Sequence, residues 1–150
     1  MDNTIIAYAA GLFDGEGSID IYKASTSKNS KSISLMLRVI ITQKDGKIMH
    51  WLKDNFGGHV QMNKRPDNNW IYHWDIRSKA AETFINAILP FVKIKQSQLL
   101  LAIEFQSKKS GYLTTLKGKQ KFRKLTEEEL NERLEIKEKI KKLKKEYTLY

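Results

Sequence analysis

The chain has 150 residues, a length that suits one domain with a buried core. It contains no cysteine, which excludes disulfides and cysteine-ligated zinc and makes an intracellular location the default expectation, with the compartment open. The net charge of +10 indicates a polyanionic partner, with nucleic acid as the first candidate and an anionic membrane surface well behind it. No apolar run approaches the roughly 20 residues of a membrane helix, and the acidic, lysine-free start argues against a secretory signal.

The hydrophobic pattern predicts an α+β fold in the order αββαββα, followed by further helices. Side-chain alternation predicts two antiparallel hairpins, and 3.6-residue periodicity predicts the helices around them. The expected helices cover residues 4–14, 46–56, 79–89, 91–106 and about 126–147, and the expected strands cover residues 18–24, 34–42, 59–65 and 69–78. One domain is expected over residues 1–150, with a core at about 4–106, an exposed basic loop at 107–124 and a C-terminal helix at 126–147.

The first predicted helix has one stripe that carries almost no side chains. Ala7, Gly11 and Gly15 recur every four residues, which places them on one face of the helix. Small residues at this spacing let a second helix backbone approach closely. Since glycine in a helix costs about 1 kcal/mol relative to alanine, close helix packing is the natural reason for the stripe.

This helix runs into the acidic stretch DGEGSID at residues 14–20. The stretch is not an EF-hand loop, because its sixth and twelfth positions are Ile19 and Ser25 instead of glycine and glutamate. It is not a dinucleotide fingerprint either, because it lacks the third glycine and connects a helix to a strand instead of a strand to a helix.

The position of Gly15 and Glu16 at a helix C-terminus favours a metal site. A carboxylate beside free backbone carbonyls offers hard oxygen ligands for Mg²⁺ or Ca²⁺. Two such helices packed through their glycines would bring two carboxylates together, as two-metal phosphodiester hydrolysis requires. The competing interpretation is that Asp14 and Glu16 only cap and solvate a turn.

Residues 9–17, AAGLFDGEG, resemble the nine-residue signature of the LAGLIDADG homing endonucleases. The segments VIITQKDGK (39–47) and LPFVKIKQSQ (89–98) resemble the flanks of the active site in the homodimeric branch that carries a single signature. The resemblance implies that two signature helices pack together and that each antiparallel sheet forms a saddle in the DNA major groove. It also implies metal-dependent cleavage of a long, nearly palindromic target with short 3′ overhangs. Mg²⁺ is the expected metal, and Ca²⁺ or Mn²⁺ can substitute in the site.

The resemblance also implies roles for individual residues around the signature. Glu16 corresponds to the metal-binding acid, and Gly15 to the position whose carbonyl also reaches metal. Gln43 and Lys95 correspond to catalytic residues that position water or stabilise the developing phosphorane charge. The expected dimer interface consists of Ala7, Gly11, Asp14 and Gly15, of which Asp14 corresponds to a structural acid.

Two residues depart from the usual signature of this family. Ala9 replaces the usual leucine, and Glu16 replaces aspartate and is one methylene longer. The family uses both acids, so the substitution at Glu16 leaves activity expected and the metal preference open.

Alternation separates a core face of the predicted strands from a polar face that is expected to contact DNA. Arg38, Gln61 and Asn63 are the best base readers by chemistry, because arginine suits guanine and the amides suit adenine. The orientation of the last strand is open: the family register favours Tyr72 and Trp74 on the DNA face, and polarity favours His73 and Arg77. The expected DNA-binding set is Asp20, Tyr22, Lys28, Ser34, Met36, Arg38, Ile40, Thr42, Lys47, His59, Gln61, Asn63, Lys64, Tyr72, Trp74, Lys117 and Lys119.

Two functions of another class remain open on the same scaffold. One is an RNA maturase that helps an intron to splice, and the other is a DNA-binding regulator without catalysis. Neither function needs the carboxylate of Glu16, whereas an endonuclease needs it. The joint presence of Glu16, Gln43 and Lys95 favours the enzyme.

Overall fold

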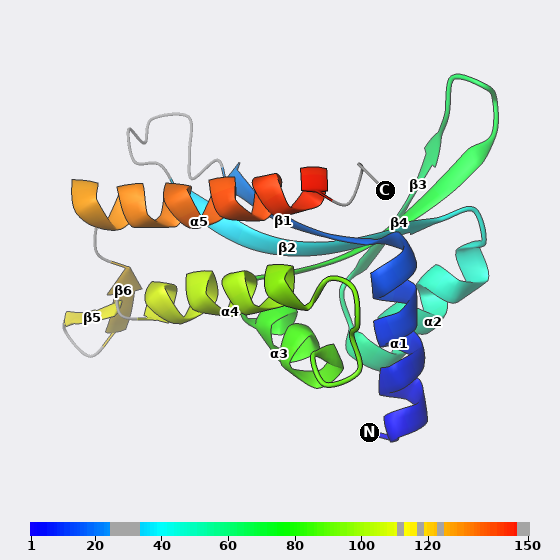
Figure 1. Cartoon of the computed structure of the whole chain (residues 1–150), viewed down its shortest axis with the longest axis horizontal. Coiled ribbons are helices and arrows are strands. Elements are labelled where there is room, and N and C mark those ends of the chain that lie inside the picture. Colours follow the sequence, from blue (N-terminus) through cyan, green and yellow to red (C-terminus); the bar gives the residue numbers. More distant parts are fainter. Residues whose placement is uncertain (25–33, 111–112, 117–118, 123–124, 147–150) are drawn as a thin grey trace.

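The computed structural model describes residues 1–24, 34–110, 113–116, 119–122 and 125–146. Its elements confirm the predicted αββαββα order (Figure 1). They are α1 (Asn3–Glu16), β1 (Gly17–Ala24), β2 (Ser34–Gln43), α2 (Gly46–Phe56), β3 (His59–Lys64), β4 (Trp70–Arg77), α3 (Ser78–Ile88), α4 (Gln96–Ser110), β5 (Leu113–Leu116), β6 (Lys119–Phe122) and α5 (Glu127–Glu146). None of the helices in these ranges is long and apolar enough to cross a membrane.

Two predicted segments differ from the structure. The helix expected from residue 91 begins only at Gln96, because the chain from 91 to 95 turns past the end of α1. The basic loop expected over residues 107–124 is wrong in its described part, where α4 continues to Ser110 and β5 pairs with β6 as a hairpin. Lysine-rich composition led to the prediction of a loop, because composition carries no information on strand pairing.

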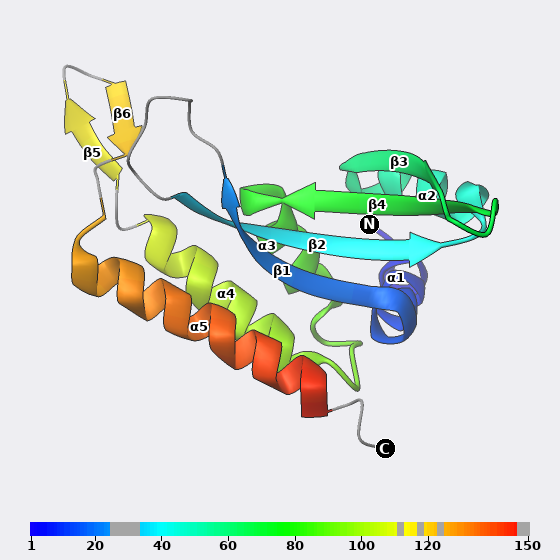
Figure 2. The ribbon, with the colours of Figure 1, turned by 90° about the horizontal axis from the view of Figure 1, so that it is seen from above.

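The main sheet is antiparallel and has the strand order β1-β2-β4-β3. Helices α3 and α4 lie on one face of this sheet (Figure 1), and α5 runs alongside α4 near the edge strand β1 (Figure 2). The other face of the sheet carries no helix in the described part of the chain, so its side chains are open to a partner.

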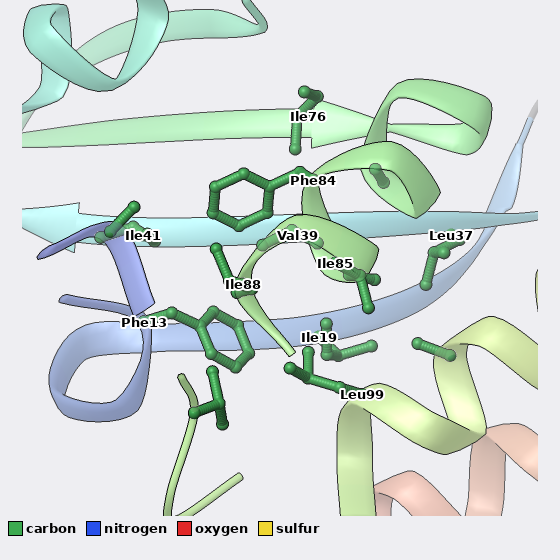
Figure 3. Close-up of a cluster of buried hydrophobic side chains, with 14 of the residues drawn as sticks. Phe13, Ile19, Leu37, Val39, Ile41, Ile76, Phe84, Ile85, Ile88 and Leu99 are labelled. Atoms are coloured by element: carbon green, nitrogen blue, oxygen red, sulfur yellow. The ribbon is translucent and has the colours of Figure 1, made fainter. Parts of the chain in front are cut away.

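The core lies between the sheet and the helices. Alternate residues of β1 and β2 point into it, and Ile19 and Val39 face each other in register with no exposed surface. Phe13 from α1, Ile85 and Ile88 from α3, and Leu99 from α4 complete the packing (Figure 3). The predicted core face of the first hairpin is therefore confirmed.

Strand β4 settles the orientation that the sequence left open. Trp74 is fully buried opposite Ile41 and donates a 2.8 Å hydrogen bond from Nε1 to the carbonyl of Gly57. The expectation that Trp74 faces DNA is wrong, because this large ring fills the core beside Phe84. Tyr72 shares the Trp74 face of β4, and its ring lies where a Cβ on Gly46 would come within 2.7 Å.

The polar residues of β4 lie on the opposite face. His73, Asp75 and Arg77 stand opposite Thr42, Ile40 and Arg38 of β2. The polarity criterion was thus correct for this strand, and the family register was not.

The junction between α1 and β1 has no loop. The backbone N–H of Gly17 donates to the carbonyl of Phe13, and the next residues enter the strand directly. A Cβ on Gly17 would lie 2.2 Å from Cδ2 of Phe13 and 2.6 Å from its carbonyl oxygen. Only glycine fits this close approach, which fixes the direction of α1 relative to the sheet.

The substitution Gly17→Ala is expected to destabilise the fold. Relief of the contact must move Phe13 or the helix end, and overpacking of this kind costs about 1–3 kcal/mol. Urea unfolding of both variants measures the effect, with the neighbouring Ser18→Ala on the open face as control. Equal midpoints for Gly17→Ala and wild type would contradict the close approach.

Candidate active site

The C-terminal end of α1 presents the acid that the sequence singled out. Glu16 is the last residue of the helix, and its side chain is exposed. The carbonyl of Gly15 belongs to the last turn, where carbonyls have no partner further along the helix. A carboxylate and a helix-terminal carbonyl, both rich in negative charge, thus lie side by side.

A shallow depression brings this helix end together with Gln43. Gln43 closes β2, and its Oε1 accepts a 2.8 Å hydrogen bond from the backbone N–H of Lys44. Because this bond uses the amide oxygen, the side-chain NH₂ group of Gln43 remains available to donate to a ligand. The depression is lined by Ala7, Tyr8, Gly11, Leu12, Gly15, Glu16 and Gln43.

The small-residue stripe of α1 forms the floor of this depression. At both Gly11 and Gly15, no described atom outside the local helix lies within 4 Å of the place that a Cβ would take. Ala7 is exposed as well. The stripe is therefore left open by the described part of the chain, although glycine at these positions weakens the helix.

Asp14 is tied to a segment far away in the sequence. Its carboxylate accepts hydrogen bonds from the backbone N–H groups of Lys93 at 2.7 Å, Ile94 at 3.2 Å and Lys95 at 3.1 Å. Three amides directed at one carboxylate make a strong, charge-assisted anchor. This contact gives Asp14 a structural role at the end of α1.

Lys95 completes the connection in the opposite direction. Its Nζ donates to the carbonyl of Gly17 at 2.7 Å and to that of Phe13 at 3.2 Å. Burial lowers the pKa of the Lys95 amine below its ordinary value, and the nearby carboxylates of Asp14 and Glu16 oppose the shift. The amine thus lies within the electrostatic reach of Glu16, at the junction of helix and strand.

The open face of the sheet gathers the predicted base-contacting residues. Register places the polar residues of β1, β2 and β3 on the same side as His73, Asp75 and Arg77. Asp20 and Arg38 form an ion pair at 2.6 Å, and Oγ1 of Thr42 lies 2.8 Å from Nδ1 of His73. The predicted residues on this face are Asp20, Tyr22, Ser34, Met36, Arg38, Ile40, Thr42, His59, Gln61 and Asn63.

Sequence reasoning left Asp75 out of the functional set and named His73 and Arg77 only as the alternative for the last strand. Asp75 is 8% exposed and pairs with the guanidinium of Arg77 at 2.6 Å. The signal was present in the alternation of polar residues along β4. The family register favoured the aromatic residues on this face, so the orientation of the strand stayed open.

The predicted lysines are spread over several elements or fall outside the described residues. Lys47 lies in the first turn of α2, and Lys64 ends β3 with an exposed side chain. Lys119 begins β6. Lys28 and Lys117 fall outside the described residues.

One copy of the chain offers an incomplete metal site. Within the described ranges, no group of three or more histidine, aspartate or glutamate side chains could hold a metal ion. The Glu16 carboxylate and the Gly15 carbonyl are nevertheless the hard oxygen donors that Mg²⁺ and Ca²⁺ prefer. A cation bound there would need further oxygens from a second copy, a phosphate or water.

Comparisons with known proteins give one family match. A family model described as LAGLIDADG endonuclease matches residues 9–91, which is more than half of the chain. A search of curated proteins gives no match.

Several solved structures share the fold. The homing endonuclease I-CvuI in complex with its target has a TM-score of 0.72 at 18% identity, over 94% of this chain and 82% of that chain. The archaeal intron-encoded homing endonuclease I-Vdi141I complexed with DNA has a TM-score of 0.70 at 17% identity, over 95% and 86% of the two chains. The meganuclease I-AabMI bound to uncleaved DNA has a TM-score of 0.64 at 21% identity, over 92% of this chain and 46% of that chain.

The substitution Asp14→Asn is expected to lower the melting temperature. The amide keeps the shape of the side chain but loses the negative charge that three N–H groups share, and each hydrogen bond to a charged group contributes about 1.5–3 kcal/mol to stability. Thermal unfolding of the purified variant measures the loss, with Asp54→Asn on the exposed face of α2 as control. A melting temperature equal to that of the control would argue against the anchor.

Proposed function

The chain belongs to the LAGLIDADG endonuclease family, and we propose on that premise that it is a site-specific DNA endonuclease that acts as a homodimer. The observation that carries the proposal is the depression in which Glu16, Gly15 and Gln43 meet along the bare stripe of α1. Acid, amide and an open helix face are the parts that a paired hydrolytic centre needs. We propose further that the chain forms a single endonuclease domain.

The bare stripe supports a dimer built through α1. The stripe is open in one copy, and packing of Gly11 and Gly15 against their counterparts would allow two helix backbones to approach closely. Each copy contributes one Glu16, so the pair would place two carboxylates near the symmetry axis. The match to I-AabMI covers 46% of that chain, which leaves room there for a second unit of similar length.

The oxygens at the end of α1 suit a divalent metal, for which we propose Mg²⁺, with Ca²⁺ or Mn²⁺ able to occupy the same position. The Glu16 carboxylate and the Gly15 carbonyl would hold it, together with oxygens from the partner copy and the DNA. When bound, such a metal lowers the pKa of water and neutralises charge on the scissile phosphate.

Gln43 and Lys95 would assist from either side of this position. The NH₂ group of Gln43, whose Oε1 is held by Lys44, can orient the attacking water or donate to a phosphate oxygen. The Lys95 amine contributes positive charge beside the junction of α1 and β1, where charge develops on the phosphate. Its carbonyl contacts fix its position before the substrate arrives.

The open face of the sheet is the proposed DNA-binding surface. Polar side chains from four strands share one uncovered face, and the net charge of +10 provides general attraction to phosphate. A symmetric dimer reads two half-sites in opposite directions, so the target is expected to be long and nearly palindromic. The proposed product is a double-strand break with short 3′ overhangs.

The experiment that tests the function is cleavage of a sequence-diverse pool of duplex DNA by the purified protein with Mg²⁺, followed by sequencing of the ends. One pseudo-palindromic motif with short 3′ overhangs is expected, and EDTA should abolish it. Salt-sensitive binding to DNA or structured RNA without any cutting would instead support a regulator or a maturase.

The substitution Glu16→Gln should abolish cleavage and leave DNA binding within about threefold of wild type. The amide keeps the size of the side chain and removes the charge that the metal needs, whereas binding depends on the sheet face and the lysines. Cleavage and gel-shift assays measure both properties, with Glu138→Gln on the exposed face of α5 as matched control. Full cleavage by Glu16→Gln would remove this residue from the mechanism.

The substitution Gly11→Leu should convert the dimer into a folded monomer. A leucine meets no described atom within its own copy at the first side-chain carbon, and it suits a helix better than glycine, but it would separate two packed stripes. Analytical ultracentrifugation should show the halved mass, and double-strand cleavage should be lost with it. Asn86→Leu on the exposed face of α3 serves as control. A monomeric wild-type protein, or a dimeric Gly11→Leu variant, would refute this interface.

A further inference from the structure

We propose that Arg77 reads a guanine in each half-site of the target and that Asp75 and Tyr22 hold it in the reading position. The inference rests on the proposed function, because it requires duplex DNA on the open face of the sheet. It moves the main guanine contact from Arg38, which chemistry alone favoured, to a residue of the next strand.

Arg38 and Arg77 stand directly opposite each other on β2 and β4. Like charges at such a cross-strand pair repel and destabilise a sheet. Each arginine pairs with a different carboxylate. A terminal nitrogen of Arg38 lies 2.6 Å from Asp20, and Nε of Arg77 lies 2.6 Å from Asp75. The Arg38–Asp20 pair is partly exposed on both sides, and pairs of this kind contribute little to stability, so recognition is the better reason for two arginines at this place.

The ring of Tyr22 lies beneath both guanidinium groups. The Cζ atom of Arg38 is 4.8 Å from the ring centroid, and that of Arg77 is 5.9 Å from it. Cation–π attraction draws both groups toward one aromatic ring, which limits the positions that they can sample. The cluster is therefore assembled before a ligand binds, which reduces the entropy lost on binding.

The two arginines are not equally available to a ligand. The Arg38 side chain is 29% exposed, and its Nε is buried without a hydrogen-bond partner among the described residues. The Arg77 side chain is 48% exposed, and its contact with Asp75 uses Nε. The contact with Asp75 does not use the two terminal nitrogens of Arg77, and a pair of this kind can match O6 and N7 of guanine in the major groove.

Asp75 acts as the positioning residue for Arg77. Its side chain is 11% exposed, and its hydrogen bond to Arg77 is the main cause that raises the pKa of this guanidinium above its ordinary value. The backbone of Asp75 is approached closely by Gly58, where a Cβ would lie 2.6 Å from the Asp75 carbonyl oxygen. The backbone of Asp75 is thus tightly packed, and its nearly buried carboxylate limits the positions that the Arg77 guanidinium can take.

The test is a binding selection from a randomised duplex DNA pool in EDTA, which prevents cleavage and reports sequence preference alone. The wild-type motif should contain a strongly preferred guanine at one position of each half-site. Arg77→Lys keeps the charge but loses the planar fork, so the preference at that position should fall about tenfold to a hundredfold. Lys79→Ala, which removes an exposed positive charge two residues away, should leave the motif unchanged.

Asp75→Asn separates reading from positioning. It should weaken the same guanine preference while total DNA affinity stays within about threefold of wild type, because no phosphate contact is removed. If this variant fails to fold in a thermal melt, Arg77→Lys alone decides the assignment.

The outcomes distinguish this inference from the proposed function. A guanine preference that survives Arg77→Lys overturns the inference even if the protein cleaves DNA. A wild-type protein that selects no motif overturns it too. A selected motif whose guanine is lost in Arg77→Lys supports the inference, even if no cleavage with Mg²⁺ is found and the endonuclease proposal fails.

Discussion

The tie between the end of α1 and residues 93–95 is the constraint on which the rest of the structure depends. Asp14 accepts from three backbone amides of this segment, and Lys95 donates back to two carbonyls at the end of α1. Gly17 connects α1 directly to β1, because its N–H donates to the carbonyl of Phe13 and a side chain at this position would clash with Phe13. The helix end therefore has one position relative to both the sheet and the later helices.

The position of the α1 end brings two surfaces to Glu16, the bare stripe of α1 and the open face of the sheet. The bare stripe of α1 leads up to it, and β1 leaves from it to form part of the open face. A partner copy on the stripe and a duplex on the sheet would thus meet at the same carboxylate. Any change that tilts α1 would move the interface, the acid and the recognition surface together, so stability at this junction is also a condition for geometry in the site.

The sequence predicted most of the fold because its local signals agree with one another. Alternation identified the inward residues of β1 and β2, and Gly57 ended the helix 46–56 at the predicted residue. Strand β4 was ambiguous because aromatic residues occupy one face and polar residues the other, and either set could face a nucleic acid. Its orientation is set by pairing with β2, a contact between distant segments that periodicity does not contain. The anchor of Asp14 escaped notice for the same reason, since its partners lie about eighty residues away.

On the open face, general attraction to DNA and recognition of its sequence come from different residues, which the net charge alone does not show. The surplus of +10 comes mainly from lysines, of which the chain has many more than arginines. The two arginines at the centre of the face are each neutralised by an acid of the sheet, so the cluster of Asp20, Arg38, Asp75 and Arg77 carries no net charge. A neutral cluster gains little from phosphate attraction and loses little when salt screens it. The arginine donors of the cluster can form hydrogen bonds whose strength depends on the base that they contact. The lysines of the chain attract the phosphates of any sequence.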